Sequence, residues 1–186
     1  MKARSALRAA SHAMGGDGAG AAVLTATDEQ DRGVLSTHIH ADGNHAEMLW
    51  TEAAGSKNHP RISAEDIAAG RHYPRMEGRE VFKHAVKRMP EVVMEALEAN
   101  DLTTNDIDLL IPHQANLRIS QMVQRRLGLE DDQVVNNIQR YGNTTAATIP
   151  IALAEAVRDE RLERGDLLCL VAFGSGLTWG SALVRW

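Results

Sequence analysis

The chain has 186 residues and weighs 20.3 kDa, a length typical of one domain or little more. It is 44% hydrophobic and 24% charged, as expected of a globular protein that buries a core. A formal net charge of −5 argues against nucleic-acid binding through bulk charge, and no apolar run approaches the roughly 20 residues that a membrane-spanning helix needs. The one cysteine, Cys169, excludes an internal disulfide and is typical of a reducing, cytoplasmic compartment.

The first part of the chain predicts a leader, two short strands and a long connection. Residues 1–14 are rich in alanine and arginine and are expected to form a poorly defined leader. A glycine-rich stretch leads into a strand candidate at residues 21–24, and residues 34–40 alternate as a second strand, so the two are expected to pair as a hairpin. The polar residues 42–76 predict a surface excursion with a short helix near residues 63–69.

The second part alternates between helices and strands. Helical periodicity covers residues 77–100, and Pro90 is expected to break or kink this helix. Two more helices are predicted, at residues 116–127 and 144–163. Four apolar runs are predicted as strands, at residues 107–111, 134–136, 167–172 and 177–186. This alternation predicts an α/β fold in which helices pack on a mixed sheet.

Three of the predicted strands are each followed by a small polar cluster. The clusters contain His113, Asn143 and the glycine-flanked turn at residues 174–176. If the strands are parallel, the clusters meet at one edge of the sheet, where open α/β sheets bind ligands. An imidazole can donate or accept a proton, a carboxamide offers a fixed donor, and the turn exposes backbone N–H groups that could hold an oxyanion. This set could stabilise an enolate or a tetrahedral thioester adduct, but it lacks a nucleophile.

Each of these features also has a purely structural interpretation. His113 could be a hydrogen-bonded core histidine, Asn143 could cap the following helix, and residues 174–176 could be only a hairpin turn. Cys169 lies within an apolar run, and we interpret it as a small buried hydrophobe because a reactive cysteine needs exposure and an electropositive setting.

Two further motifs are rejected because the surrounding sequence does not fit the function that each would suggest. Residues 16–21 fit a loose G-x-G-x-x-A dinucleotide pattern, but no strand precedes them and a predicted strand, not a helix, follows. His38 and His40 would share a strand face and could bind a metal ion with His45, but no other ligand spacing supports this, so solvated surface histidines are the favoured interpretation. No metal site is predicted.

The polar clusters resemble motifs of the β-ketoacyl-acyl-carrier-protein synthase III family. Residues 112–119, PHQANLRI, resemble its histidine motif, and residues 141–147, YGNTTAA, its asparagine motif. Residues 173–186 are similar to its carboxyl terminus, and residues 16–24 and 41–43 also match, so the resemblance runs in order over about residues 15–186.

The resemblance implies the thiolase fold, which has two similar halves of layered α/β/α structure, each with a mixed five-stranded sheet. By it, residues 15–42 would be the terminal strand pair of the first half, and residues 43–186 the C-terminal catalytic half. The family's nucleophilic cysteine lies in the first half and has no counterpart here. The implied partners are therefore a complementing N-terminal half or a second copy in a homodimer, and the chain alone is expected to be inactive.

The implied reaction is the decarboxylative Claisen condensation of malonyl-acyl-carrier protein with a short acyl-coenzyme A, which starts type II fatty acid synthesis without a cofactor. His113 and Asn143 would hydrogen-bond the malonyl thioester oxygen, and the backbone N–H of Ser175 would help to form an oxyanion hole. Arg118 would meet the acidic carrier protein, although a solvated helix charge is an equal alternative from the sequence. The residues implied to line the substrate tunnel are Gly78, Phe82, Asn116 and Phe173.

Two other readings stay open. One is a relative that uses the same Cys-His-Asn chemistry in polyketide or alkylquinolone-type synthesis. The other is a non-catalytic remnant that folds in part and turns nothing over.

Overall fold

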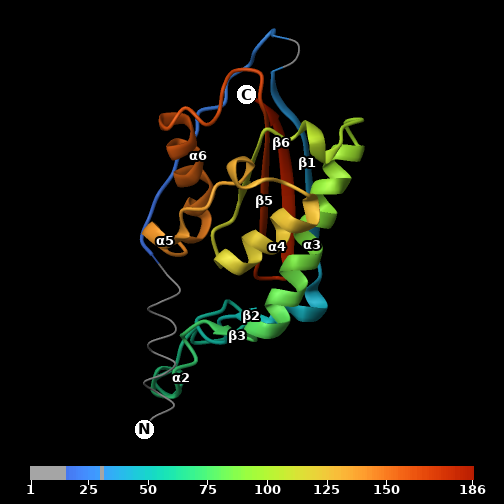
Figure 1. Ribbon diagram of the computed structural model, residues 1–186. Coiled ribbons are helices and arrows are strands. Elements are labelled where there is room, and N and C mark those ends of the chain that lie inside the picture. The colour runs from blue at the N-terminus through green and yellow to red at the C-terminus, as the bar shows by residue number, and fades with distance from the viewer. Residues whose placement is uncertain (1–15, 30–31) are drawn as a thin grey trace.

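The main sheet has four paired strands in a computed structural model that describes residues 16–29 and 32–186 (Figure 1). Their order is β1-β6-β5-β4, and β6 runs antiparallel to both of its neighbours whereas β4 and β5 are parallel. The mixed sheet is thus as predicted. The strands are β1 (Gly33–Ala41), β4 (Leu109–Pro112), β5 (Leu167–Gly174) and β6 (Thr178–Arg185). The strand predicted at residues 134–136 forms only a single parallel bridge between Val134 and Leu110, so the sheet has four paired strands and not the five that the resemblance implied.

Helices cover both faces of this sheet, which gives the layered α/β/α arrangement (Figure 1). Alternate residues of β5 face opposite layers because side chains along a strand alternate in direction. Cys169 and Val171 join the core under α3 (Gly78–Glu98) and α4 (Leu117–Leu127), whereas Leu168 joins a second core under α6 (Thr148–Arg158). The shorter elements are η1 (Gly43–Met48), β2 (Leu49–Trp50), α2 (Ala64–Ala69), β3 (Arg75–Met76), η2 (Thr104–Asp106), η3 (Asp131–Gln133), α5 (Ile138–Tyr141) and η4 (Thr145–Ala147).

The predicted hairpin near the amino terminus is wrong. Residues 21–24 form no strand, and Val23 and Leu24 are 90% and 84% exposed. An extended apolar run becomes a strand only where a neighbouring backbone accepts its hydrogen bonds, and none of the described strands pairs with this segment. β1 pairs with β6 instead. The strand predicted at residues 34–40 is therefore an edge strand of the same sheet as the C-terminal strands. The predicted leader at residues 1–14 lies outside the described residues.

The predicted helices are present, with two differences in their extent. α3 continues through Pro90, because its buried residues on both sides of the proline, Met89 and Val92 among them, hold the helix on the sheet despite the lost hydrogen bond. α6 begins after the predicted start and ends before the predicted end. Thr145 and Glu160 both have a φ of 54°, which a right-handed helix excludes.

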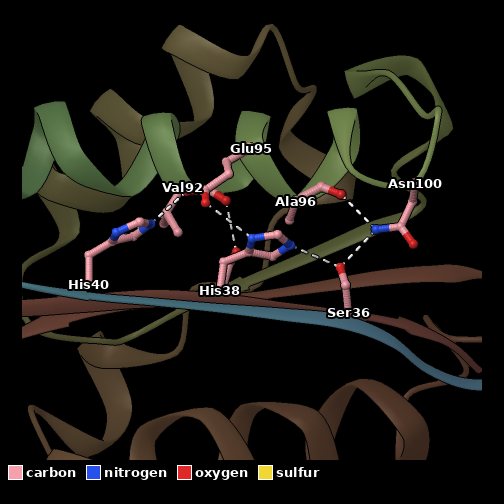
Figure 2. Close-up of polar contacts among 8 residues, drawn as sticks. Ser36, His38, His40, Val92, Glu95, Ala96 and Asn100 are labelled. Atoms are coloured by element: carbon pink, nitrogen blue, oxygen red, sulfur yellow. Dashed lines mark hydrogen bonds and ion pairs between the residues drawn. The ribbon is translucent and has the colours of Figure 1, made fainter.

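Polar side chains attach the edge strand β1 to α3 (Figure 2). Glu95 binds Nδ1 of His38 at 3.2 Å through one carboxylate oxygen and Nε2 of His40 at 2.6 Å through the other. Next to them, Nδ2 of Asn100 donates to Oγ of Ser36 at 2.7 Å. Because residues 36, 38 and 40 share one face of the strand, Ile39 points to the opposite face, where it is 80% exposed.

Candidate active site

One broad groove brings together all the side chains that the sequence singled out for the site. Its volume of about 2070 Å³ exceeds the roughly 300–1,000 Å³ of an ordinary small-molecule pocket. The predicted site residues that line it are Gly78, Phe82, His113, Asn116, Arg118, Asn143, Phe173 and Ser175.

His113 stands directly after β4, where its backbone N–H continues the parallel ladder by donating to Val171 O at 2.8 Å. Its ring Nδ1 lies 2.7 Å from Oγ1 of Thr148, the first residue of α6. Burial lowers the pKa of the imidazole, so His113 is neutral near pH 7. Since Thr148 occupies Nδ1, Nε2 is the ring nitrogen left to meet a ligand in the groove.

Asn143 lies in the loop between α5 and η4, and a hydrogen bond from a nearby backbone N–H holds its side chain in place. Its Oδ1 accepts the N–H of Thr145 at 2.8 Å, so Nδ2 is the free end of the carboxamide and offers hydrogen-bond donors. This contact, two positions along the chain, forms a local turn, and Asn143 does not cap α6, whose N-cap residue is Ala147. The turn and a donor role are compatible, because they use opposite ends of the amide.

The turn at residues 174–176 connects β5 to β6, so it is a hairpin turn, and it also lines the groove. Gly176 has a φ of +134°, and a Cβ there would lie 2.6 Å from Cγ2 of Thr178, so the turn requires glycine. Ser175 at its tip is exposed. Its backbone N–H has no acceptor among residues 16–29 and 32–186, which leaves it available to an oxyanion.

The outer part of the groove is built from α3 and α4. Asn116 caps α4 by accepting the N–H of Arg118 at 2.9 Å, and the guanidinium of Arg118 lies 5.7 Å over the ring of Phe82. Gly78 begins α3. Phe173 is only 7% exposed and packs against Trp179 with ring centroids 6.4 Å apart, so it borders the groove largely as a core residue.

A buried amide, which the sequence analysis missed, joins the two polar loops. Gln114, 2% exposed, donates to Pro112 O at 2.8 Å and Val135 O at 3.0 Å. Its Oε1 accepts the N–H groups of Asn137 at 3.0 Å and Ile138 at 3.2 Å. All hydrogen-bonding positions of this amide are therefore used. The only signal in the sequence was a long polar side chain between a buried strand and a helix cap.

A buried carboxylate holds the other side of the Asn143 loop. Glu155 of α6, 6% exposed, accepts Nδ2 of Asn137 and Nη2 of Arg140, each at 2.8 Å, and the hydroxyl of Tyr141. Burial raises the pKa of Glu155, but the hydrogen bonds from Tyr141 and Asn137 outweigh it and hold the pKa below its ordinary value. Glu155 follows Thr148 and Ala152 on the buried face of α6, and a carboxylate on an apolar helix face was the signal that sequence analysis passed over.

Cys169 and the histidines of β1 take no part in this site. Burial raises the pKa of the Cys169 thiol to about 12, which fits its interpretation as a buried hydrophobe. His38 and His40 share Glu95, whereas His45 faces Asp42 and His84. Within the described part of the chain, no cluster of three or more potential ligands could hold a metal ion, and no helix has the length and apolarity to cross a membrane.

Comparison with known proteins relates the C-terminal part of the chain to a known family. Residues 97–186 match the family described as 3-oxoacyl-[acyl-carrier-protein] synthase III C terminal. The beta-ketoacyl-[acyl-carrier-protein] synthase III of Acidiphilium cryptum strain JF-5 is 52% identical over 172 residues, which are 91% of this chain and 50% of that protein. The chain spans about half the length of the curated relatives it matches.

Solved structures agree on the fold. The beta-ketoacyl-[acyl-carrier-protein] synthase III of Thermus thermophilus superposes with a TM-score of 0.75 and 42% identity, covering 85% of this chain and 47% of that one. The priming β-ketosynthase of the R1128 polyketide pathway superposes with a TM-score of 0.72 and 31% identity, covering 82% and 44%. The fold is thus the thiolase-like fold that the sequence motifs implied.

Proposed function

Because residues 97–186 carry the C-terminal domain of the 3-oxoacyl-[acyl-carrier-protein] synthase III family, we propose that this chain activates the malonyl thioester in a decarboxylative Claisen condensation. The observation that carries the proposal is the shared support of two side chains. The backbone N–H of Thr145 holds Asn143, and the hydroxyl of Thr148, three positions further along the chain, contacts His113. The imidazole and the carboxamide line the same groove.

The reaction would proceed by loss of CO₂ from the malonyl thioester. The electron pair of the broken C–C bond passes into the thioester as an enolate, whose oxygen accepts hydrogen bonds from Nε2 of His113 and Nδ2 of Asn143. Donors of this kind, aimed at a developing oxyanion, typically contribute about 10²–10³ in rate each. The thioester itself delocalises the electrons, so the step requires no cofactor.

The enolate carbon then attacks an acyl thioester on a cysteine. A C–C bond forms, the carbonyl oxygen becomes an oxyanion that accepts the N–H of Ser175, and its collapse expels the cysteine thiolate. Cys169 cannot be this cysteine, because its thiol is buried and its pKa is raised to about 12. The nucleophile would come from a complementing half, and the exposed face of β1 around Ile39 offers an apolar surface on which such a half or a second copy could pack.

The substrates proposed are malonyl-acyl-carrier protein and a short acyl-coenzyme A, in the cytoplasm. Arg118 is exposed at the groove, where its guanidinium suits the carboxylates and phosphate of a carrier protein and its pantetheine arm. Asn116 and Phe82 lie beside it and would line the path of that arm.

A titration of the ¹⁵N-labelled chain with a non-cleavable malonyl-pantetheine analogue tests this proposal. The signals of the His113 ring and the Asn143 side-chain amide are expected to shift together and saturate. Asn143→Ala should weaken the binding, whereas Gln139→Ala on the exposed surface should not. A remnant without function would show no saturable shift, and shifts confined to residues outside the groove would refute the assignment.

A polyketide-type condensing enzyme is the second candidate, since the R1128 priming ketosynthase shares the fold at 31% identity. The two functions differ in acyl donor and extender. Carrier-protein-bound and coenzyme-A-bound malonyl groups should therefore be compared as ligands. Preference for the coenzyme A form would favour the second candidate.

A further inference from the structure

Three rings stand in a row across the main sheet, beside the groove. Trp179 of β6 pairs directly with His40 of β1 on one side and with Phe173 of β5 on the other. Side chains that stand directly opposite each other on antiparallel strands point to the same face of the sheet, and here that face is the one that α3 covers. The ring centroids of His40 and Trp179 are 5.6 Å apart with planes at 21°, and those of Trp179 and Phe173 are 6.4 Å apart with planes at 23°. Both distances are within the range of attractive ring pairs.

Trp179, the middle ring of the row, is held by both the helix and the edge strand. The guanidinium of Arg88, on α3, lies 4.9 Å over its ring, a distance at which a cation is attracted to an aromatic face. His40 is fixed in turn, because its Nε2 binds a carboxylate oxygen of Glu95 at 2.6 Å (Figure 2). Trp179 also packs against the main core. These contacts hold its ring in one position on the sheet.

Phe173, the last ring of the row, forms part of the wall of the groove. It lines the same groove as His113 and Asn143, but it is only 7% exposed. A side chain in close-packed surroundings keeps a single rotamer only while its neighbours fill the space beside it. Across the strand, the neighbour that fills this space is Trp179. Removal of that ring opens room for a second rotamer of Phe173, and the wall of the groove would change with it.

We infer that Trp179 is a positioning residue: through the row of rings it holds Phe173 in one rotamer and so fixes a wall of the groove that His113 and Asn143 also line. The inference rests on the proposed function, because the shape of that wall matters to the reaction only if the groove receives the malonyl thioester. Trp179 acts through Phe173, and Arg88 and His40 act through Trp179.

The rotamer of Phe173 can be measured in the full chain without turnover. The chain has two phenylalanines, Phe82 and Phe173, so phenylalanine labelled with ¹³C and ¹⁵N gives one set of signals for each, and Phe82→Leu assigns them. The three-bond couplings from the backbone nitrogen and carbonyl carbon to Cγ report χ1 and do not depend on neighbouring ring currents. The wild type should show the couplings of one staggered rotamer. Trp179→Leu should average them, whereas Trp179→Tyr, which keeps a ring at this place, should retain them.

The same variants are then titrated with the non-cleavable malonyl-pantetheine analogue. Trp179→Leu should bind it about 2–10-fold more weakly, the factor to which the loss of one aromatic pair corresponds, and Trp179→Tyr should bind it as the wild type does. Trp50→Leu, in β2, is the matched control, because that ring lies against Lys57. It should change neither the couplings of Phe173 nor the affinity.

Wild-type couplings in folded Trp179→Leu would overturn the inference, since the core alone would then hold Phe173, and so would an undiminished affinity for the analogue. If Trp179→Leu does not fold, the partly exposed neighbours that hold Trp179 are replaced instead. Arg88→Ala combined with His40→Ala should then average the couplings of Phe173, and unchanged couplings would count against the inference. Failure of the proposed function gives a different result. The couplings would respond as inferred in the free chain, but the analogue would bind to none of the proteins, the wild type included.

Discussion

The backbone N–H of Asn137 donates to the side-chain Oε1 of Gln114 at 3.0 Å, across 23 positions of the chain. Gln114 adjoins His113, and Asn137 precedes the α5 helix that leads to Asn143. The bond therefore ties the loop that carries the imidazole to the loop that carries the carboxamide. Both partners are buried, so water does not compete for it.

Removal of the Gln114 amide should destabilise the fold and loosen the site. Gln114→Ala leaves the N–H groups of Asn137 and Ile138 without their acceptor, and buried unsatisfied groups of this kind cost about 1–3 kcal/mol each. We expect a loss of about 3 kcal/mol in the free energy of unfolding measured in urea. Gln121→Ala, on the exposed face of α4, is the matched control and should change it by less than about 0.5 kcal/mol. Equal stabilities of the two variants would contradict this role.

Glu155 should make stability depend on pH in the acidic range. Its pKa in the folded chain lies below its unfolded value of about 4.3, so between these two values the unfolded chain binds more protons and stability rises with pH. The contribution is complete above the unfolded pKa and is lost as the pH falls through the folded pKa.

Comparison with Glu155→Gln isolates that contribution. The wild type should be more stable by about 2 kcal/mol near pH 6, the size expected for hydrogen bonds to a charged group, and the difference should shrink below about pH 4. Glu98→Gln, at the exposed end of α3, serves as the control. If the difference in unfolding free energy between the two proteins stays constant down to pH 2.5, the charge of Glu155 does not stabilise the loop that carries Asn143.

The glycines of residues 16–20 should be needed to hold this segment against α6. A Cβ at Gly20 would lie 2.4 Å from the ring of Pro150, and the N–H of Gly16 donates to Asn143 O at 2.8 Å. Gly20→Ala should therefore release the segment and speed hydrogen exchange at Gly16. Gly43→Ala is the matched control, because nothing lies within 4 Å of a Cβ there. Unchanged exchange in Gly20→Ala would refute the packing.

Cys169 should be inert, and the chain alone should not condense. With its pKa raised to about 12 by burial, the thiol should react with a disulfide reagent at pH 8 only as fast as the chain unfolds. No condensation product is expected from the purified chain. Turnover by the chain alone that survives Cys169→Ala would contradict the account, since another group would then have to be the nucleophile.

The sequence predicted the strands and helices that bury continuous apolar faces. β5, β6 and α4 are where periodicity placed them, and the polar clusters after β4 and β5 do share one groove with Asn143. The prediction errors lie where tertiary contacts, and not the local sequence pattern, determine the secondary structure. Residues 21–24 have the composition of a strand but no neighbour to pair with, and Pro90 lies within α3 because packing on the sheet outweighs the bond that proline removes.

The residues that hold the site in place could not be predicted from the sequence, and the reason is physical. Gln114, Thr148 and Glu155 act through contacts with residues up to 35 positions away. Such contacts depend on how α5 and α6 pack beside β4, which no local period encodes. The available signal was a polar residue on an otherwise apolar face. Such a residue indicates that its side chain has a buried hydrogen-bond partner, but the sequence does not show which residue that partner is.

The most direct test of the central claim is the rate of condensation when the chain is combined with the amino-terminal half of a relative such as the Acidiphilium cryptum synthase, of which this chain covers 50%. The account predicts that malonyl-carrier protein is then consumed, and that His113→Ala and Asn143→Ala each lower the rate by about 10²–10³ while Gln121→Ala does not. An unaltered rate in either site variant, with the assembled protein folded, would contradict it.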